Sequence, residues 1–588
     1  MKYEPLSPAA LAGWRSAQDL WGVHMHDARF APNAKMPSFA WFAFPPTVTV
    51  DPVLAARTGV DGEWPSIFAH ELGHHVLSPS TRLDQLKIEQ QMARALSATS
   101  VGAVGHLAEK CAYLSNVWSD MLINVRVAEM QREQRPDSEP GMVRMWRILS
   151  STPTTDPAWW AMMRAYEELW SLPDGTLCGA TPPPINTTAD TVAGDYTTLF
   201  AANPVVDAQL IADTVRFFGE DPIRGALRFG MILAPYLVSQ PDGERPQDSA
   251  ACAGEQGGGP PTAAELGEVM RDGRLREAPQ HPAIGSGGGA GAGSSAAGGQ
   301  GYGLAATLQL YAASDRNAVV EAWYTSRARN WIRPLTQRAL APSATSLELP
   351  AALEEWSIDD EIELIDWPST LARGPRVIPG VTTRYRSHMA DEAQSDRQSV
   401  HLDLYIDSSG SMTPPSSESP AVLAATILML SVLRGGGRVR VTSFSGPGQV
   451  AGNDSFTRDR AALLNAVTTY FGGGTTFPLD LLAQRYAQPR PTAPGVESLR
   501  HLVVLSDEGL MSFFGVGQPE YATVAATVRA RLDTATLLVM DSRHSIGAAA
   551  DRAGYAVEYL KSMDDAPPAC ARLARAIENY RRRPVRHG

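Results

Sequence analysis

WPSIFAHELGHHVLSP, residues 64–79, sets the architecture of the N-terminal half of this chain. Pro65 suits the first turn of a helix and Pro79 is a natural stop, so the spacing predicts one helix between them. Apolar residues recur at every fourth position along it, which favours one face packed inward. These residues are Phe68, Leu72 and Val76.

A second face of this predicted helix carries His70 and His74, one turn apart, with Glu71 beside them. Neutral imidazoles are good ligands for Zn²⁺, and a carboxylate next to a zinc-bound water can take its proton. The pattern H-E-x-x-H resembles the metal-binding motif of the zincin metallopeptidases. A chance match on a helix is the alternative. The helical context and Gly73, which allows close backbone approach, favour a zinc site with Glu71 as the catalytic base.

Bulk properties exclude several classes of function. The chain has 588 residues, which predicts several domains, and a formal net charge of −12, which argues against a nucleic-acid-binding surface. We find no apolar run long enough for a membrane span and no secretory start. Its four cysteines are far apart and form no C-x-x-C pair, so we expect a cytoplasmic protein without disulfides. They are Cys111, Cys178, Cys252 and Cys570.

A long helical pattern from Val101 to about Arg132 supplies the next candidates. Asn116, Asp120 and Asn124 stand at i, i+4 and i+8, a polar stripe bordered by apolar residues. Buried polar groups need partners, so we expect this stripe to face the histidines. Asp120 could then be the third zinc ligand, with the two asparagine side chains orienting it.

This second helix resembles the E-x-x-x-D helix of gluzincins, in which the Glu binds zinc and the Asp bonds a ligand histidine. Asn116 stands here in the Glu position, which leaves two options open: Asp120 ligates directly, or Asn116 or water fills the site. We expect Asp120 to ligate because an anionic oxygen binds Zn²⁺ better than an amide does. The stretch also resembles the N-x-x-x-D-x-x-I-N segment of bacterial metallopeptidase-like proteins fused to von Willebrand factor A (VWA) domains. Asn116, Asp120, Ile123 and Asn124 match it.

The composition divides the chain into four parts. Residues 1–250 are predicted as a zincin-like domain and residues 251–303 as a flexible Gly/Ala-rich linker. A helical and extended connector is expected over 304–397, followed, as the resemblance implies, by a VWA domain over 398–588. Within the first part, residues 38–50 favour strands. In zincins a strand beside the metal helix often binds the substrate by edge pairing, which the resemblance implies here.

From Val400 onward, short apolar strands alternate with helices. Buried strands alternating with helices predict a doubly wound, mostly parallel sheet, in which ligands bind beyond the carboxyl ends of strands. The strands are expected over residues 400–406, 438–444, 501–505 and 535–540.

Three segments at such strand ends carry a second candidate site. Asp407, Ser409 and Ser411 match D-x-S-x-S, Thr475 follows three glycines that are expected to open a helix, and Asp507 follows a strand. An all-oxygen, low-charge set suits Mg²⁺ or Mn²⁺ with an open position. These loops resemble the metal-ion-dependent adhesion site of VWA domains, with Thr476 a close competitor for Thr475. The resemblance implies that an acidic side chain of a partner protein completes the site.

The sequence therefore predicts a multidomain protein: a mainly helical, zincin-like α+β N-terminal domain and a C-terminal α/β doubly wound VWA domain. The expected function is that of a zinc metallopeptidase coupled to a VWA protein-binding module. Proteins that resemble this pair often act with MoxR-type AAA+ ATPases. The alternative is a non-proteolytic metal-binding adaptor or scaffold, which Asn116 in place of a gluzincin Glu supports.

Overall fold

The computed structural model divides into two compact units, so the chain is multidomain as predicted. Residues up to Arg327, with Ser416–Glu418, form the N-terminal unit, and Ala328–Pro415 with Ser419–Gly588 form the C-terminal unit. The structure describes residues 3–32, 34, 38–99, 104–151, 155–185, 202–238, 260–276, 303–335, 337–343, 347–360, 362, 365–374, 376–390, 394–398, 400–487 and 499–580. No helix in these ranges is both long and apolar enough to cross a membrane.

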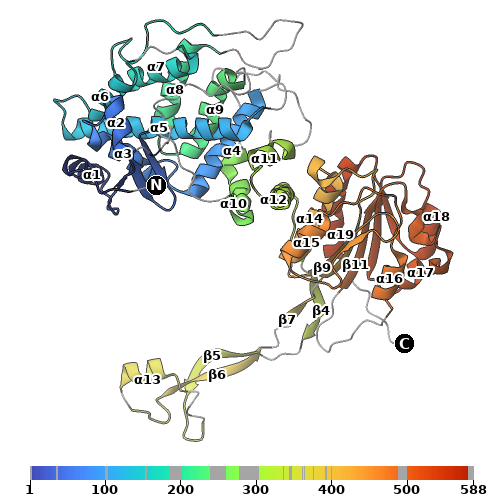
Figure 1. The fold of residues 1–588 in the computed structure, drawn as a ribbon. Helices are drawn as coiled ribbons and strands as arrows, with labels where there is room; N and C mark the ends of the chain where they lie inside the picture. Colours follow the sequence, from blue (N-terminus) through green and yellow to red (C-terminus); the bar gives the residue numbers. More distant parts are fainter. Residues whose placement is uncertain are drawn as a thin grey trace. The chain divides into compact units, whose positions relative to one another are not determined.

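The N-terminal unit is mainly helical and carries one small sheet (Figure 1). Strand β3 pairs in parallel with β1 and antiparallel with β2, which leaves β2 at an edge of this sheet. The strands are β1 (Arg29–Phe30), β2 (Ala40–Ala43) and β3 (Thr47–Val50). The helices are α1 (Pro8–Trp21), α2 (Pro52–Thr58), α3 (Trp64–Val76), α4 (Arg82–Thr99), α5 (Leu107–Gln134), α6 (Gly141–Leu149), α7 (Pro157–Trp170), α8 (Pro204–Phe218), α9 (Pro222–Val238), α10 (Ala263–Arg271), α11 (Leu304–Leu310) and α12 (Arg316–Ala328).

Helix α3 is the helix predicted from residues 64–79, and it crosses α5 at very short range. It has Pro65 in its first turn and ends at Val76. A Cβ atom placed on Gly73 would lie 2.3 Å from Cγ2 of Ile123 in α5. A Cβ atom essentially never lies so close to another heavy atom, so any larger residue at position 73 would force Ile123 to shift.

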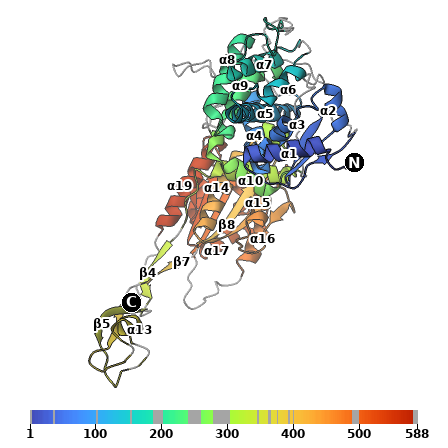
Figure 2. The ribbon, with the colours of Figure 1, turned by 90° about the vertical axis from the view of Figure 1, so that its left-hand side faces the viewer.

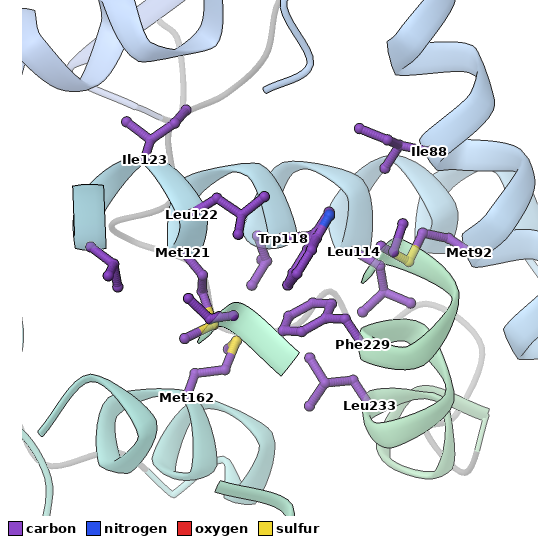
Figure 3. Close-up of a cluster of buried hydrophobic side chains, with 14 of the residues drawn as sticks. Ile88, Met92, Leu114, Trp118, Met121, Leu122, Ile123, Met162, Phe229 and Leu233 are labelled. Carbon is purple, nitrogen blue, oxygen red and sulfur yellow. The ribbon is translucent and has the colours of Figure 1, made fainter. Parts of the chain in front are cut away.

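Helix α5 runs through the centre of the N-terminal unit and is buried on more than one face (Figure 3). The ring of Trp118 packs on Phe229 of α9, with 5.0 Å between ring centroids. Met121 points towards Met162 of α7, whereas Ile123 lies on the other side of the helix, towards α3. A helix that is apolar on several sides belongs in a core. Asp120 and Asn124 of its polar stripe are buried with it, and Asn116 is half-buried.

Part of the predicted linker and connector belongs to the N-terminal unit. Helix α10 buries Leu266 and Val269. Tyr311, just beyond α11, donates its hydroxyl hydrogen bond to Oε1 of Gln90 at 2.9 Å. These contacts hold α10 and α11 on the N-terminal helices. Cys252 and Gly285–Gly289 of the predicted linker lie outside the described residues.

The C-terminal unit contains a six-stranded sheet in the order β10-β9-β8-β11-β12-β13, parallel except for β10. This confirms the α/β arrangement and the four predicted strands. The order reverses between β8 and β11, and in doubly wound sheets ligands bind at such a switch point. The strands are β8 (Val400–Asp407), β9 (Arg438–Phe444), β10 (Val450–Gly452), β11 (Leu499–Ser506), β12 (Thr534–Val539) and β13 (Ala556–Tyr559).

Helices cover both faces of this sheet (Figures 1 and 2). Helices α14 (Pro420–Arg434) and α19 (Ala566–Asn579) pack together on one face. Apolar residues of three short helices pack on the other face, in a core with Tyr405 and Val504. They are α16 (Leu479–Arg485), α17 (Val524–Arg529) and α18 (Gly547–Ala553). Helix α15 (Arg460–Val467) lies beside β9.

Two β ribbons and a short helix precede β8 along the chain, where the sequence predicted an extended connector (Figure 1). Strand β4 pairs with β7, and β5 pairs with β6, both antiparallel. Strand β7 ends at Gln398, directly before β8. The ribbon elements are β4 (Gln337–Ser343), β5 (Leu347–Glu355), α13 (Trp367–Arg373), β6 (Thr383–Ala390) and β7 (Gln394–Gln398).

Candidate metal centre

Three side chains predicted as zinc ligands meet at one buried point. His70 and His74 come from α3, and Asp120 comes from α5. The two histidine Nε2 atoms lie 3.2 Å apart. Oδ1 of Asp120 lies 3.4 Å from Nε2 of His70 and 3.2 Å from Nε2 of His74. All three residues are buried, so little water reaches these atoms.

The Nδ1 atoms of both histidines already have hydrogen-bond partners. Nδ1 of His70 lies 2.6 Å from Oδ1 of Asn124, and Nδ1 of His74 lies 3.1 Å from the carbonyl oxygen of Ser78. An amide or carbonyl oxygen only accepts, so each Nδ1 must be the donor. Each Nε2 of a neutral ring then presents its lone pair to the common point. Two lone pairs and a carboxylate oxygen at this distance repel one another unless a cation lies among them.

The pKa values of His70 and Asp120 also indicate that positive charge is stabilised at this point. Burial lowers the pKa of His70, but the charge and hydrogen bond of Asp120 outweigh it and raise the pKa to about 9. Burial likewise opposes the charged form of Asp120, and His70 and His74 together still hold the pKa of its carboxyl below the ordinary value. A proton and a metal cation compete for the same ligand atoms in such a cluster.

Asn116 stands behind Asp120 and not at the point of convergence. Its Nδ2 donates to Oδ2 of Asp120 at 3.1 Å, which leaves Oδ1 directed at the histidines. Of the two candidates for the third ligand, Asp120 thus offers the oxygen that faces both imidazoles. Asn116 and Asn124 each contact a ligand side chain from outside, as an orienting residue does.

Glu71 lines the same pocket as His70 and Asp120, and its side chain is fully buried. The free space inside the pocket is about 10 Å³, enough for about one water molecule. Apart from the polar groups, its walls are apolar side chains from α3, α6 and the segment before β2. They are Phe39, Ile67, Met145, Trp146 and Leu149. A carboxylate in such surroundings can exchange a proton with a group bound in the pocket.

Aromatic residues that sequence reasoning did not single out support the histidines. Phe42 of β2 stacks on His74, with ring centroids 4.1 Å apart and planes 16° apart. Tyr166 of α7 accepts a hydrogen bond from Nδ2 of Asn124 at 2.8 Å. The strand pattern predicted the position of Phe42 in β2, but no sequence pattern links Tyr166 to a residue 42 positions earlier.

The second candidate site gathers at the carboxyl ends of β8 and β11. The backbone N–H of Ser409 donates to Oδ1 of Asp407 at 2.9 Å, and the hydroxyls of Ser409 and Ser411 lie 3.2 Å apart. Ser506 donates to Oδ2 of Asp407 at 2.5 Å. Burial, together with the negative charge of Asp507, raises the pKa of Asp407. The two predicted carboxylates are thus close enough to interact.

The third predicted loop joins them through backbone contacts. The N–H of Gly410 donates to the carbonyl of Gly473 at 2.8 Å. A Cβ atom on Gly509 would lie 2.6 Å from Cβ of Thr475, so Thr475 abuts the loop that follows Asp507. The N–H of Thr476 instead donates to the carbonyl of Ser445. The glycine loop does not itself open a helix, since α16 begins only at Leu479.

Comparisons with known proteins leave the family of this chain unassigned. No family model matches the sequence, and no curated protein matches it. Among solved structures, the PilB minor pilin from Streptococcus sanguinis is similar at 14% identity with a TM-score of 0.24. That similarity covers 34% of this chain and 66% of the pilin chain, slightly less than two thirds.

Proposed function

We propose that this protein is a zinc-dependent metallopeptidase coupled to a VWA protein-binding module. One observation carries the proposal: two imidazole nitrogens and one carboxylate oxygen converge within 3.4 Å, in a pocket that Glu71 also lines. Two histidines and a carboxylate are a ligand set of catalytic zinc sites, which keep one position open.

The spacing of the ligand atoms supports zinc as the cation. A tetrahedral zinc ion at about 2.0–2.1 Å from each ligand would place its ligand atoms about 3.3–3.4 Å apart. The three separations here are 3.2, 3.2 and 3.4 Å. Imidazole nitrogens also favour zinc over Mg²⁺ or Ca²⁺, which prefer oxygen.

In this proposal each residue of the pocket has a defined task. Zinc held by His70, His74 and Asp120 would supply a water of lowered pKa and would polarise the substrate carbonyl. Glu71 accepts the proton of the attacking water and passes it to the leaving amine. The apolar walls exclude bulk water, which strengthens these electrostatic interactions.

The edge strand β2 is the proposed binding site for the peptide backbone. Among the described residues β2 pairs only with β3, so its other edge can add a strand. Phe42 of β2 stacks on His74, which places this strand beside the proposed metal ligands. An extended peptide paired with β2 would therefore pass the pocket.

The decisive variant is Glu71→Gln, which keeps the shape of the side chain and removes the base. We expect about one zinc per chain in the wild type and the variant, with peptide cleavage reduced by roughly 10²–10⁴-fold. Metal analysis by mass spectrometry and digestion of a proteome-derived peptide library measure the two quantities. Glu109→Gln, at an exposed position of α5, is the matched control and should cleave like the wild type. Equal cleavage by the wild type and Glu71→Gln, including none by either, would refute the peptidase.

The C-terminal unit is proposed to bind Mg²⁺ or Mn²⁺ through Asp407, Ser409, Ser411, Thr475 and Asp507. The position of these loops at the β8/β11 switch point supports a ligand site. A partner protein would complete the ion with an acidic side chain, and we propose a MoxR-type AAA+ ATPase as the partner to test. Binding of the purified ATPase should require Mg²⁺ and should be lost in chelator. We propose a cytoplasmic location, because the described cysteines are free thiols.

A non-proteolytic metal-dependent scaffold is the second candidate. The burial of the site favours it, since His74 and Glu71 are 0% exposed and give a polypeptide little access. The same experiment separates the two: a scaffold binds zinc but cleaves nothing.

A further inference from the structure

We infer that Tyr166 is a positioning residue for the metal centre, acting on His70 through Asn124. The inference rests on the zinc site proposed above and extends it to α7, a helix in which the sequence indicated no chemistry. Tyr166 is not one of the three residues that converge on the proposed metal position. Its hydroxyl is the outer end of a buried chain of two hydrogen bonds that ends on the ring of His70.

The chain has a direction set by the chemistry of its groups. Nδ1–H of His70 donates to Oδ1 of Asn124 at 2.6 Å, and Nδ2–H of Asn124 donates to the hydroxyl oxygen of Tyr166 at 2.8 Å. Asn124 is 0% exposed and Tyr166 is 2% exposed, so water does not substitute for either partner. Without the hydroxyl, the NH₂ group of Asn124 would lose this buried acceptor.

The ring of Tyr166 is held so that its hydroxyl has little freedom. It stacks on Trp170, with 4.4 Å between ring centroids and 14° between planes. Its centroid lies 5.2 Å from that of Trp146, which lines the pocket. Aromatic neighbours therefore fix the tyrosine, the tyrosine fixes the amide, and the amide fixes the ring of His70 with Nε2 towards His74 and Asp120.

Loss of the hydroxyl should act on zinc affinity through the amide. In Tyr166→Phe the side chain of Asn124 would turn to find another partner, and the acceptor for His70 Nδ1–H would be displaced. Outer hydrogen-bond partners of metal ligands typically contribute about 10–100-fold in affinity. We expect the more remote Tyr166 to contribute about tenfold, at the low end of that range.

The test is a double-mutant cycle on zinc affinity, measured in the full chain by competition of Zn²⁺ with a chromophoric chelator. Tyr166→Phe should bind zinc about tenfold more weakly than the wild type. In the Asn124→Leu background, where the intermediate link is gone, the same substitution should change affinity by less than about twofold. A tyrosine that serves only packing would give the same loss in both backgrounds.

Tyr236→Phe is the matched control. Tyr236 of α9 is also buried in the N-terminal unit, and its hydroxyl donates to Oδ2 of Asp207 at 2.5 Å, away from the ligands. This variant should lower the melting temperature of the metal-free protein and leave zinc affinity within about twofold. Wild-type affinity in Tyr166→Phe, or an undiminished penalty in the Asn124→Leu background, would overturn the inference. Absence of zinc binding by the wild type would instead refute the proposed function.

Discussion

The two candidate sites of this protein are built by opposite means. In the N-terminal unit, the candidate nitrogen and carboxylate ligands project from α3 and α5 towards one buried point. In the C-terminal unit, carboxylates and hydroxyls stand on loops beyond β8 and β11, and Ser411 is exposed. Helix packing positions the first set, whereas backbone hydrogen bonds between loops position the second. The first site should therefore respond to changes in the core, and the second to changes in its loops.

The largest expected effect is the loss of zinc in His74→Ala. Removing a ligand should weaken zinc binding by more than the about 10–100-fold that outer partners contribute. Zinc per chain after gel filtration measures the loss. Because the two sites lie in different units, Mg²⁺ binding should be unchanged. The exposed His106→Ala should retain zinc, and full zinc content in His74→Ala would show that the cluster holds no metal.

The converse variant is Asp407→Asn, which should weaken Mg²⁺ binding and leave zinc binding unchanged. Replacing one of two carboxylates should weaken Mg²⁺ binding by at least about tenfold, equivalent to about 1.4 kcal/mol, because the amide lacks the charge that the ion requires. Calorimetric titration of Mg²⁺ measures it, with zinc content as the internal control. A parallel fall in zinc content per chain would mean that the two sites are coupled, and would contradict the view that they are built independently.

The smallest expected effect tests whether the packing of α3 on α5 positions the first site. Gly73→Ala would gain helix propensity, but its methyl group would lie 2.3 Å from Ile123. Overpacking typically costs about 1–3 kcal/mol, more than the about 1 kcal/mol that alanine gains over glycine. Chemical denaturation should therefore show a net loss of stability.

Gly267→Ala in α10 is the control, because its added Cβ would meet only Arg271, at 3.4 Å. This variant should be as stable as the wild type or slightly more so. A stabilised Gly73→Ala would mean that the two helices can separate, and would remove the basis of the comparison.

Sequence reasoning succeeded where a feature is local in the chain. The helix around His70 and His74 and the strands of the C-terminal unit follow from periodicity, and the structure confirms them. The convergence of Asp120 on the histidines followed from a polar stripe in an apolar helix, since only a partner inside the core could satisfy it.

What the sequence did not reveal depends on contacts between distant segments. Tyr166 reaches Asn124 because α7 packs beside α5, a relation without any pattern in the chain. Strands β10 and β13 are short edge strands of three and four residues, too brief for a periodic signal. The contact that joins Tyr311, just beyond α11, to Gln90 of α4 likewise links residues far apart in the chain, which no local pattern predicts.

The close crossing of α3 and α5 at Gly73 also bears on which ions the protein can select. The side chain of Ile123 packs against Gly73, and both ligand-bearing helices belong to one buried core, so separating them to fit a larger ion would open a void in that core. Cd²⁺ should therefore be disfavoured relative to zinc beyond what its ligand chemistry dictates. The close packing at position 73 would thus limit the radius of the ion that the three ligands can hold.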